Sequence, residues 1–229
     1  ILPCVALGTA TFIMQASESV ISICFNASLL KYGDDIAVGA MTILSSVMQF
    51  AMLPLQGIAQ GSQPITSYNY GARNSARVRQ TFRLLVKVCL CYSVALWAII
   101  QLFPGIFAQI FTPNADLVAF TVPALRVYCA ALFLFGIQIA CQMTFVSIGY
   151  AVCSIIVAVL RKFILLLPLI YLLPHLLADQ TMAVYTAEPV ADAIAVTCTA
   201  ILFGVQFHKA MQKLEQEAET QNSPASDAR

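Results

Sequence analysis

The chain has 229 residues, of which 60% are hydrophobic and only 10% are charged, and its mean hydropathy is +0.83. A soluble domain carries about 25% charged residues, so this composition excludes a water-soluble surface and indicates a chain covered mostly by lipid. The formal net charge of +1 provides no basic field and argues against a nucleic-acid partner. The chain begins with Ile1-Leu2-Pro3, already apolar and without a charged leader, and we expect it to begin partway through a larger protein.

Six apolar stretches reach the length of about 20 residues that a membrane-spanning helix requires. They predict an all-α, polytopic membrane domain at residues 1–210, followed by a polar cytoplasmic tail at 211–229. We expect this tail to continue the last helix briefly and then to be disordered. The predicted spans are 3–30, 36–64, 84–108, 117–146, 152–174 and 182–207.

No enzyme motif is present. The only histidines are His175, in a loop, and His208, at a helix end, and the sequence lacks H-E-x-x-H, G-x-S-x-G and Gly-rich phosphate motifs. The eight cysteines form no C-x-x-C or zinc-type spacing, so we read them as small hydrophobic residues. We therefore expect no catalytic residue, metal site or bound cofactor.

The distribution of Lys and Arg predicts the orientation, because cytoplasmic loops of membrane proteins are enriched in them. If the spans alternate in direction, Lys31 is the sole basic residue in the short loops of one side. The other side holds most of the basic residues, and we expect it, with both ends of the chain, to be cytoplasmic. These residues are Arg73, Arg77, Arg79, Arg83, Lys87, Arg161, Lys162, Lys209 and Lys213.

Two predicted spans contain helix-breaking residues. A proline inside a helix removes a backbone hydrogen bond and bends the helix. In membrane proteins such positions either serve packing or mark bending points and cavity walls. The sequence leaves both readings open for Pro54, Gly57, Gly61 and Pro64 in the second span and for Pro168 in the fifth.

Four ionisable residues lie within the predicted spans: Glu18, Arg126, Glu188 and Asp192. From the outer ends of their spans their depths are about 18, 14, 9 and 15 Å at a rise of 1.5 Å per residue. Charges at this depth usually face the bundle interior or a water-filled cavity. We expect Arg126 to pair with Glu188 or Asp192 as a structural lock, which leaves two acids unmatched. An unmatched buried carboxylate takes up a proton or binds a cation.

Glu18 lies in a polar seam of the first span with Gln15, Ser17, Ser22 and Asn26. Such a seam can simply join helices through hydrogen bonds. With a carboxylate at its centre, however, it favours a functional site. We therefore predict that Glu18 takes part in cation coupling.

Several stretches resemble the multidrug and toxic compound extrusion (MATE) family. The run PLQGIAQGSQPI at 54–65, followed by YNYGAR at 68–73, is similar to the eighth helix of that family. FIMQASES at 12–19 resembles the seventh helix, ALRVY at 124–128 the tenth and AEPVAD at 187–192 the twelfth.

This resemblance implies one six-helix lobe, the C-terminal one, of a twelve-helix transporter whose N-terminal lobe is missing from the chain. It implies exchange of H⁺ or Na⁺ for a drug or cationic toxic compound across the inner (plasma) membrane. Glu18 matches the seventh-helix acid that many members use in coupling. Many of those members also have an aspartate in the tenth helix, where this chain offers only Gln138 and Gln142 as cavity-lining candidates.

Two other functions remain open at the level of the sequence. One is a related flippase-type exporter of lipids or oligosaccharides, and the other is a structural or receptor-like membrane domain. The last would not explain unmatched acids inside the membrane.

Overall fold

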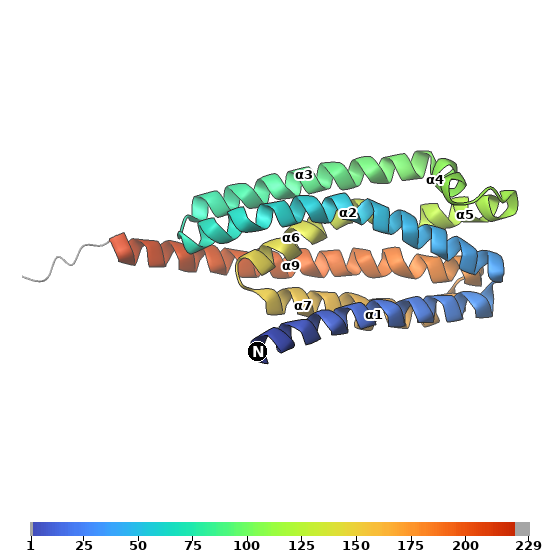
Figure 1. Cartoon of the computed structure of the whole chain (residues 1–229), viewed down its shortest axis with the longest axis horizontal. Helices are drawn as coiled ribbons and strands as arrows, with labels where there is room; N and C mark the ends of the chain where they lie inside the picture. Colours follow the sequence, from blue (N-terminus) through green and yellow to red (C-terminus); the bar gives the residue numbers. More distant parts are fainter. Residues whose placement is uncertain (1, 223–229) are drawn as a thin grey trace, which may run out of the picture. The chain divides into compact units, whose positions relative to one another are not determined.

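The computed structural model describes the backbone of residues 2–222 and the side chains of residues 16–217, apart from 151, 152 and 155. The described backbone consists of helices joined by short turns, and no strand occurs within it. The prediction of an all-α chain is therefore confirmed. In chain order (Figure 1) the elements are α1 (Leu2–Tyr32), α2 (Asp35–Gly71), α3 (Ser75–Leu102), α4 (Pro104–Phe111), α5 (Ala115–Tyr128), the 3₁₀ turn η1 (Leu132–Leu134), α6 (Phe135–Ser147), α7 (Ala151–Val159), the π-helix η2 (Leu160–Leu166), α8 (Leu167–Leu176) and α9 (Gln180–Asn222).

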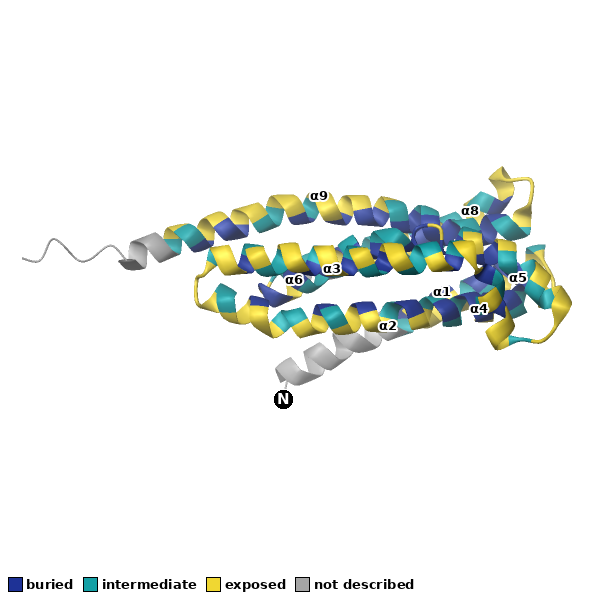
Figure 2. Ribbon diagram, turned by 90° about the horizontal axis from the view of Figure 1, so that it is seen from above, coloured by how far each residue is buried: buried dark blue, intermediate teal, exposed yellow. Residues whose placement is uncertain are grey.

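Several helices have the length and composition of membrane spans. Within the described residues, four segments qualify on their own: Asp35–Gly71, Ser75–Leu102, Ile156–Leu176 and Gln180–Glu217. A fifth span results if Ala115–Tyr128 and Leu132–Ser147, bent by 41° at their break, count as one. α1 has 31 residues, more than the roughly 20 that a bilayer requires. These six segments follow the order of the six predicted spans, and Figure 2 shows exposed residues along the length of α2 and α3, as expected for helices that face lipid.

The predicted fourth span is not one continuous helix. α5 ends at Tyr128, and the 3₁₀ turn η1 precedes α6. The hydroxyl of Ser93 on α3 donates a hydrogen bond to the carbonyl of Phe133, at 3.0 Å. A carbonyl released from a helix inside a membrane requires such a partner. A neighbouring helix thus supports the break, which contains no glycine or proline at residues 129–135, although Gly136 follows it closely.

The fifth span changes its helix type in the middle. α7 passes into the π-helix η2, and α8 starts directly after it with Pro168 in its first turn. π-helical turns are rare and occur frequently at functional sites. In contrast, α2 continues through Pro54 and Pro64 without interruption.

The last helix continues into the predicted tail, as expected, but it extends further, because α9 ends only at Asn222. Met211 and Leu214 are buried in a cluster with Val78, Ile148 and Ala210. Arg79 Nη2 also forms a 3.0 Å salt bridge with Glu215. Apolar residues at positions 207, 210, 211 and 214 have the spacing of one helical face, which accounts for the extension. Residues 223–229, the rest of the predicted tail, lie outside the described residues.

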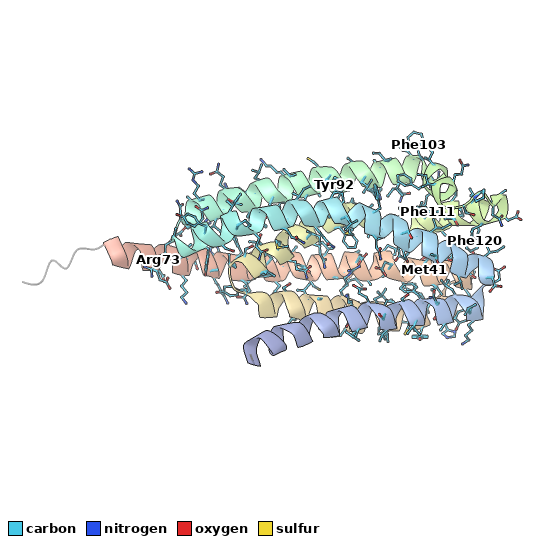
Figure 3. The ribbon with its side chains drawn as sticks, in the orientation of Figure 1. Met41, Arg73, Tyr92, Phe103, Phe111 and Phe120 are labelled. Carbon is cyan, nitrogen blue, oxygen red and sulfur yellow. The ribbon has the colours of Figure 1, made fainter. Side chains whose placement is uncertain are left out.

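The chain divides into two compact units. Unit 1 contains residues 1–48, 100–130 and 158–192, and unit 2 contains the rest. In unit 1, the hydroxyl of the fully buried Tyr185 on α9 donates to the carbonyl of Ala37 on α2, at 2.7 Å. The ring of Phe120 on α5 contacts Tyr185 edge-on, with 6.3 Å between centroids. Figure 3 labels Phe120, together with Phe103, which directly precedes α4, and Phe111, its last residue.

Unit 2 has an aromatic core. Phe203 on α9 stacks on Phe82 of α3 and on Phe207, with ring centroids 4.6 and 4.9 Å apart. Phe145 of α6 meets Phe203 edge-on at 5.0 Å. α6 also approaches α3 closely, because a Cβ atom placed on Gly136 would lie 2.7 Å from the carbonyl oxygen of Cys89. Small residues at helix contacts permit such an approach in membrane proteins.

We predict that Gly136→Ala destabilises the protein by about 1–3 kcal/mol. The added methyl group would clash with the backbone carbonyl of Cys89, which cannot change rotamer as a side chain can. The temperature at which detergent-solubilised protein loses its monodisperse peak would measure this. Gly204→Ala is the matched control, because a Cβ atom there meets nothing within 4 Å. Higher helix propensity should make that control neutral or more stable. Equal stability of Gly136→Ala and wild type would contradict the close packing of α3 and α6.

Candidate functional site

The π-helix η2 places a guanidinium between two acids of α9. Arg161 Nη2 lies 2.9 Å from Glu188 Oε1, and Arg161 Nε lies 2.5 Å from Asp192 Oδ1. Glu188 and Asp192 are four residues apart and therefore share one face of the helix. A planar guanidinium carries donors in several directions, so that one arginine can bridge both carboxylates. All three residues belong to unit 1.

The next residue of η2 reaches a different helix. Lys162 Nζ donates to Glu18 Oε1 on α1, at 2.5 Å. The Lys162 side chain is 13% exposed, whereas that of Glu18 is 59% exposed. The ammonium therefore lies within unit 1 and the carboxylate lies at its accessible edge. Two consecutive residues of η2 thus link α1 and α9.

The two ion pairs form one electrostatic cluster, which we call the charge cluster: Glu18, Arg161, Lys162, Glu188 and Asp192. Arg161 interacts with the charge of Glu18, and Glu188 interacts with the charges of Glu18 and Lys162. α5 contributes the buried Tyr128, which has Glu188 and Asp192 as charged neighbours. Within the described residues, Asp192 Oδ2 is buried without a hydrogen-bond partner.

The predicted role of Arg126 is wrong. Arg126 is exposed, and it forms no salt bridge within the part of the chain that the structure describes. The buried face of α5 contains Thr121, Ala124, Leu125 and Tyr128, and position 126 points away from it. Its backbone carbonyl accepts a hydrogen bond from Gln101 Nε2, at 2.9 Å. The acids on α9 were identified correctly, but their partner is Arg161.

Arg161 and Lys162 were expected early in the fifth span and were counted with the cytoplasmic side; their ion pairs were not predicted. Both residues lie inside the apolar span Ile156–Leu176 and pair with acids of two other spans. A signal was available, since two adjacent bases interrupt an otherwise apolar run at 156–172. The predicted orientation stays a prediction and rests on the remaining basic residues.

The polar seam of α1 is partly accessible. Glu18 and Ser22 are exposed, Asn26 is half-buried and Ser17 is buried. Gln15 lies outside the residues whose side chains are described. Gln138 and Gln142 belong to unit 2 instead, where Gln138 is buried and Gln142 is half-buried. The roles of these residues stay predictions.

The predicted bending residues lie on open helix surface. Pro54, Gly57, Gly61, Pro64 and Pro168 are all exposed. A Cβ atom on Gly57 or Gly61 would meet nothing within 4 Å. Bending at these positions stays a prediction, although η2 does place an irregular helix directly before Pro168.

An all-α bundle of apolar spans that holds ion pairs inside its helices is typical of membrane transporters. A family model described as MatE matches residues 10–172. The multidrug export protein MepA of Staphylococcus haemolyticus (strain JCSC1435) is 25% identical over 132 residues, which are 57% of this chain and 28% of that protein.

Solved structures agree with this match. The MATE multidrug transporter DinF-BH is 34% identical with a TM-score of 0.72, covering 85% of this chain and 43% of that one. A MATE in the bent conformation has a TM-score of 0.82 at 19% identity, covering 88% of this chain and 44% of that one. The chain belongs to the MatE family, a family of transporters. It spans less than half of the length of these relatives.

We predict that Arg161→Ala lowers the free energy of unfolding by about 3–5 kcal/mol, because it leaves two buried carboxylates without their cation. Thermal unfolding and the yield of monodisperse protein would measure the loss. Arg126→Ala is the matched control and should behave like wild type, because Arg126 is exposed. A larger loss in Arg126→Ala than in Arg161→Ala would contradict the assignment of the ion pairs.

Proposed function

We propose that this chain is the C-terminal lobe of a cation-coupled multidrug antiporter. The complete transporter exports drugs or cationic toxic compounds across the plasma membrane in exchange for H⁺ or Na⁺. Its partner is a second lobe of six helices, and lipid covers the remaining surface. The names of two relatives, a multidrug export protein and a multidrug transporter, support the substrate class.

The observation that carries the proposal is the position of Glu18. Its carboxylate lies within the predicted span 3–30, is 59% exposed and is paired on one side with Lys162. A charged group is costly in lipid and therefore faces protein or a water-filled cavity. We infer that the exposed side of Glu18 faces the cavity between this lobe and its partner lobe.

This position suits a competition between cations. A cationic drug or a coupling ion that reaches Glu18 meets a carboxylate already occupied by Lys162 Nζ. Protonation of Glu18, or binding of another cation, removes the attraction that links η2 to α1. Because the two states differ in the contacts of these helices, the ligand shifts the population between them. Alternating access follows if those states open to opposite sides of the membrane.

The alternative of a lipid or oligosaccharide exporter receives less support. A carboxylate at the accessible edge of the cluster attracts cations and repels the phosphate groups of lipid carriers. A purely structural domain would need Glu18 and Lys162 only as a link between helices. The following experiment distinguishes a structural link from coupling.

We predict that Glu18→Gln preserves folding and abolishes efflux driven by a pH or sodium gradient, because the amide retains the size of the side chain but cannot titrate. Efflux of a fluorescent cationic drug from vesicles that contain the full-length transporter would measure this. Asp116→Asn is the matched control, since Asp116 is an exposed acid of the same unit outside the charge cluster. Wild-type efflux rates for Glu18→Gln at matched expression would exclude its role in coupling.

A further inference from the structure

The charge cluster contains an odd number of charges. Within the described residues it consists of three acids, Glu18, Glu188 and Asp192, and two bases, Arg161 and Lys162. Residues 1–15, whose side chains are not described, include no acidic or basic residue. If every group were ionised, the cluster would carry one surplus negative charge.

The ion pairs show where this surplus lies. Glu18 has its own cation in Lys162 and is in addition the most exposed acid of the cluster. Glu188 and Asp192, in contrast, share the guanidinium of Arg161, and each uses one oxygen atom for it. The unmatched charge therefore belongs to the pair on α9.

Glu188 and Asp192 lie in a buried position, where an unmatched charge costs the most free energy. The side chains of Glu188 and Asp192 are 11% and 2% exposed, respectively. Asp192 Oδ2 has no hydrogen-bond partner within the described part of the chain. A buried ionised carboxylate without compensation is costly, and two neighbouring carboxylates do not both ionise easily.

We propose that Glu188 and Asp192 hold one exchangeable proton between them, and that this pair is a proton-binding site of the lobe in addition to Glu18. A metal cation fits the position less well than a proton. Arg161 already occupies the space between the two acids and would repel a second cation. A proton instead forms a covalent bond to one oxygen and needs no ligand shell.

Charged and titratable groups on neighbouring elements influence whether the pair on α9 keeps or releases this proton. Arg161 and Lys162 on η2 favour its release, whereas the charge of Glu18 on α1 favours its retention. The hydroxyl of Tyr128 and the thiol of Cys129 approach from α5 and the residue after it. The next step rests on the proposed function. If a cationic drug neutralises Glu18, Lys162 loses its partner, and its ammonium group then drives the proton off the α9 pair. Drug binding and proton release would then be linked within one cluster.

Infrared spectroscopy of the purified full-length transporter tests this site without measuring transport. We expect wild-type protein at neutral pH to show the carbonyl stretch of a protonated carboxylic acid. Either Glu188→Gln or Asp192→Asn should abolish the band, because the one remaining carboxylate is matched by Arg161. Glu18→Gln should show the band at low pH but lose it at a lower pH than wild type, because Lys162 is then unpaired and favours release of the proton. Asp116→Asn, an exposed acid outside the charge cluster, is the matched control and should leave the band unchanged. Both α9 variants should fold, because an amide oxygen can still accept the hydrogen bond from Arg161.

Three results would overturn the proposal. These are the absence of the acid band in wild type at neutral pH, its persistence in both α9 variants, and carboxylate bands that respond to sodium but not to pH. If an α9 variant does not fold, wild type and Glu18→Gln decide the question. Loss of the band at every pH in Glu18→Gln places the proton on Glu18 and contradicts the proposal. A band that is present at low pH and disappears at a lower pH than in wild type supports the α9 pair. Failure here would leave the efflux test of Glu18 untouched.

Discussion

The bridge from Arg161 to Glu188 and Asp192 determines the arrangement of unit 1. A guanidinium stays charged at any physiological pH, so this cation must keep a carboxylate beside it wherever the helices move. The π-helix is the local structure that carries this arginine and its neighbour Lys162 to acids on two different helices. Removal of either partner would leave a buried charge, which is far more costly than the loss of an exposed ion pair.

Hydropathy was sufficient to predict an all-α chain and the order of its apolar helices, because each span must contain about 20 apolar residues. It was insufficient for the breaks inside them. The 3₁₀ turn at Leu132–Leu134 accepts a hydrogen bond from the hydroxyl of Ser93 on another helix. The sequence around the turn does not indicate that contact. The C-terminal extension of α9 was predictable in principle, since the apolar face with Met211 and Leu214 repeats at helical spacing.

The acidic residues of the candidate site were predicted from the sequence, but the basic residues that pair with them were not. Glu18, Glu188 and Asp192 were noticed because single charges in apolar runs are conspicuous. Arg161 and Lys162, early in the predicted fifth span, were used only to predict the orientation, because basic residues are enriched on the cytoplasmic side. Sequence spacing determines which residues share a helix face, but it does not determine which helix faces which. Arg126 therefore stood out as the natural partner, although it lies on the exposed face of α5.

In the proposed mechanism the charge cluster holds one proton in addition to its ion pairs, and occupation of Glu18 by a cation releases this proton. The most direct test is the number of protons released when a saturating cationic drug is added to the purified full-length transporter in weakly buffered detergent solution. A pH-sensitive dye reports this release. We expect Asp192→Asn to release one proton fewer per bound drug than wild type. Equal release from both proteins at equal drug occupancy would contradict it.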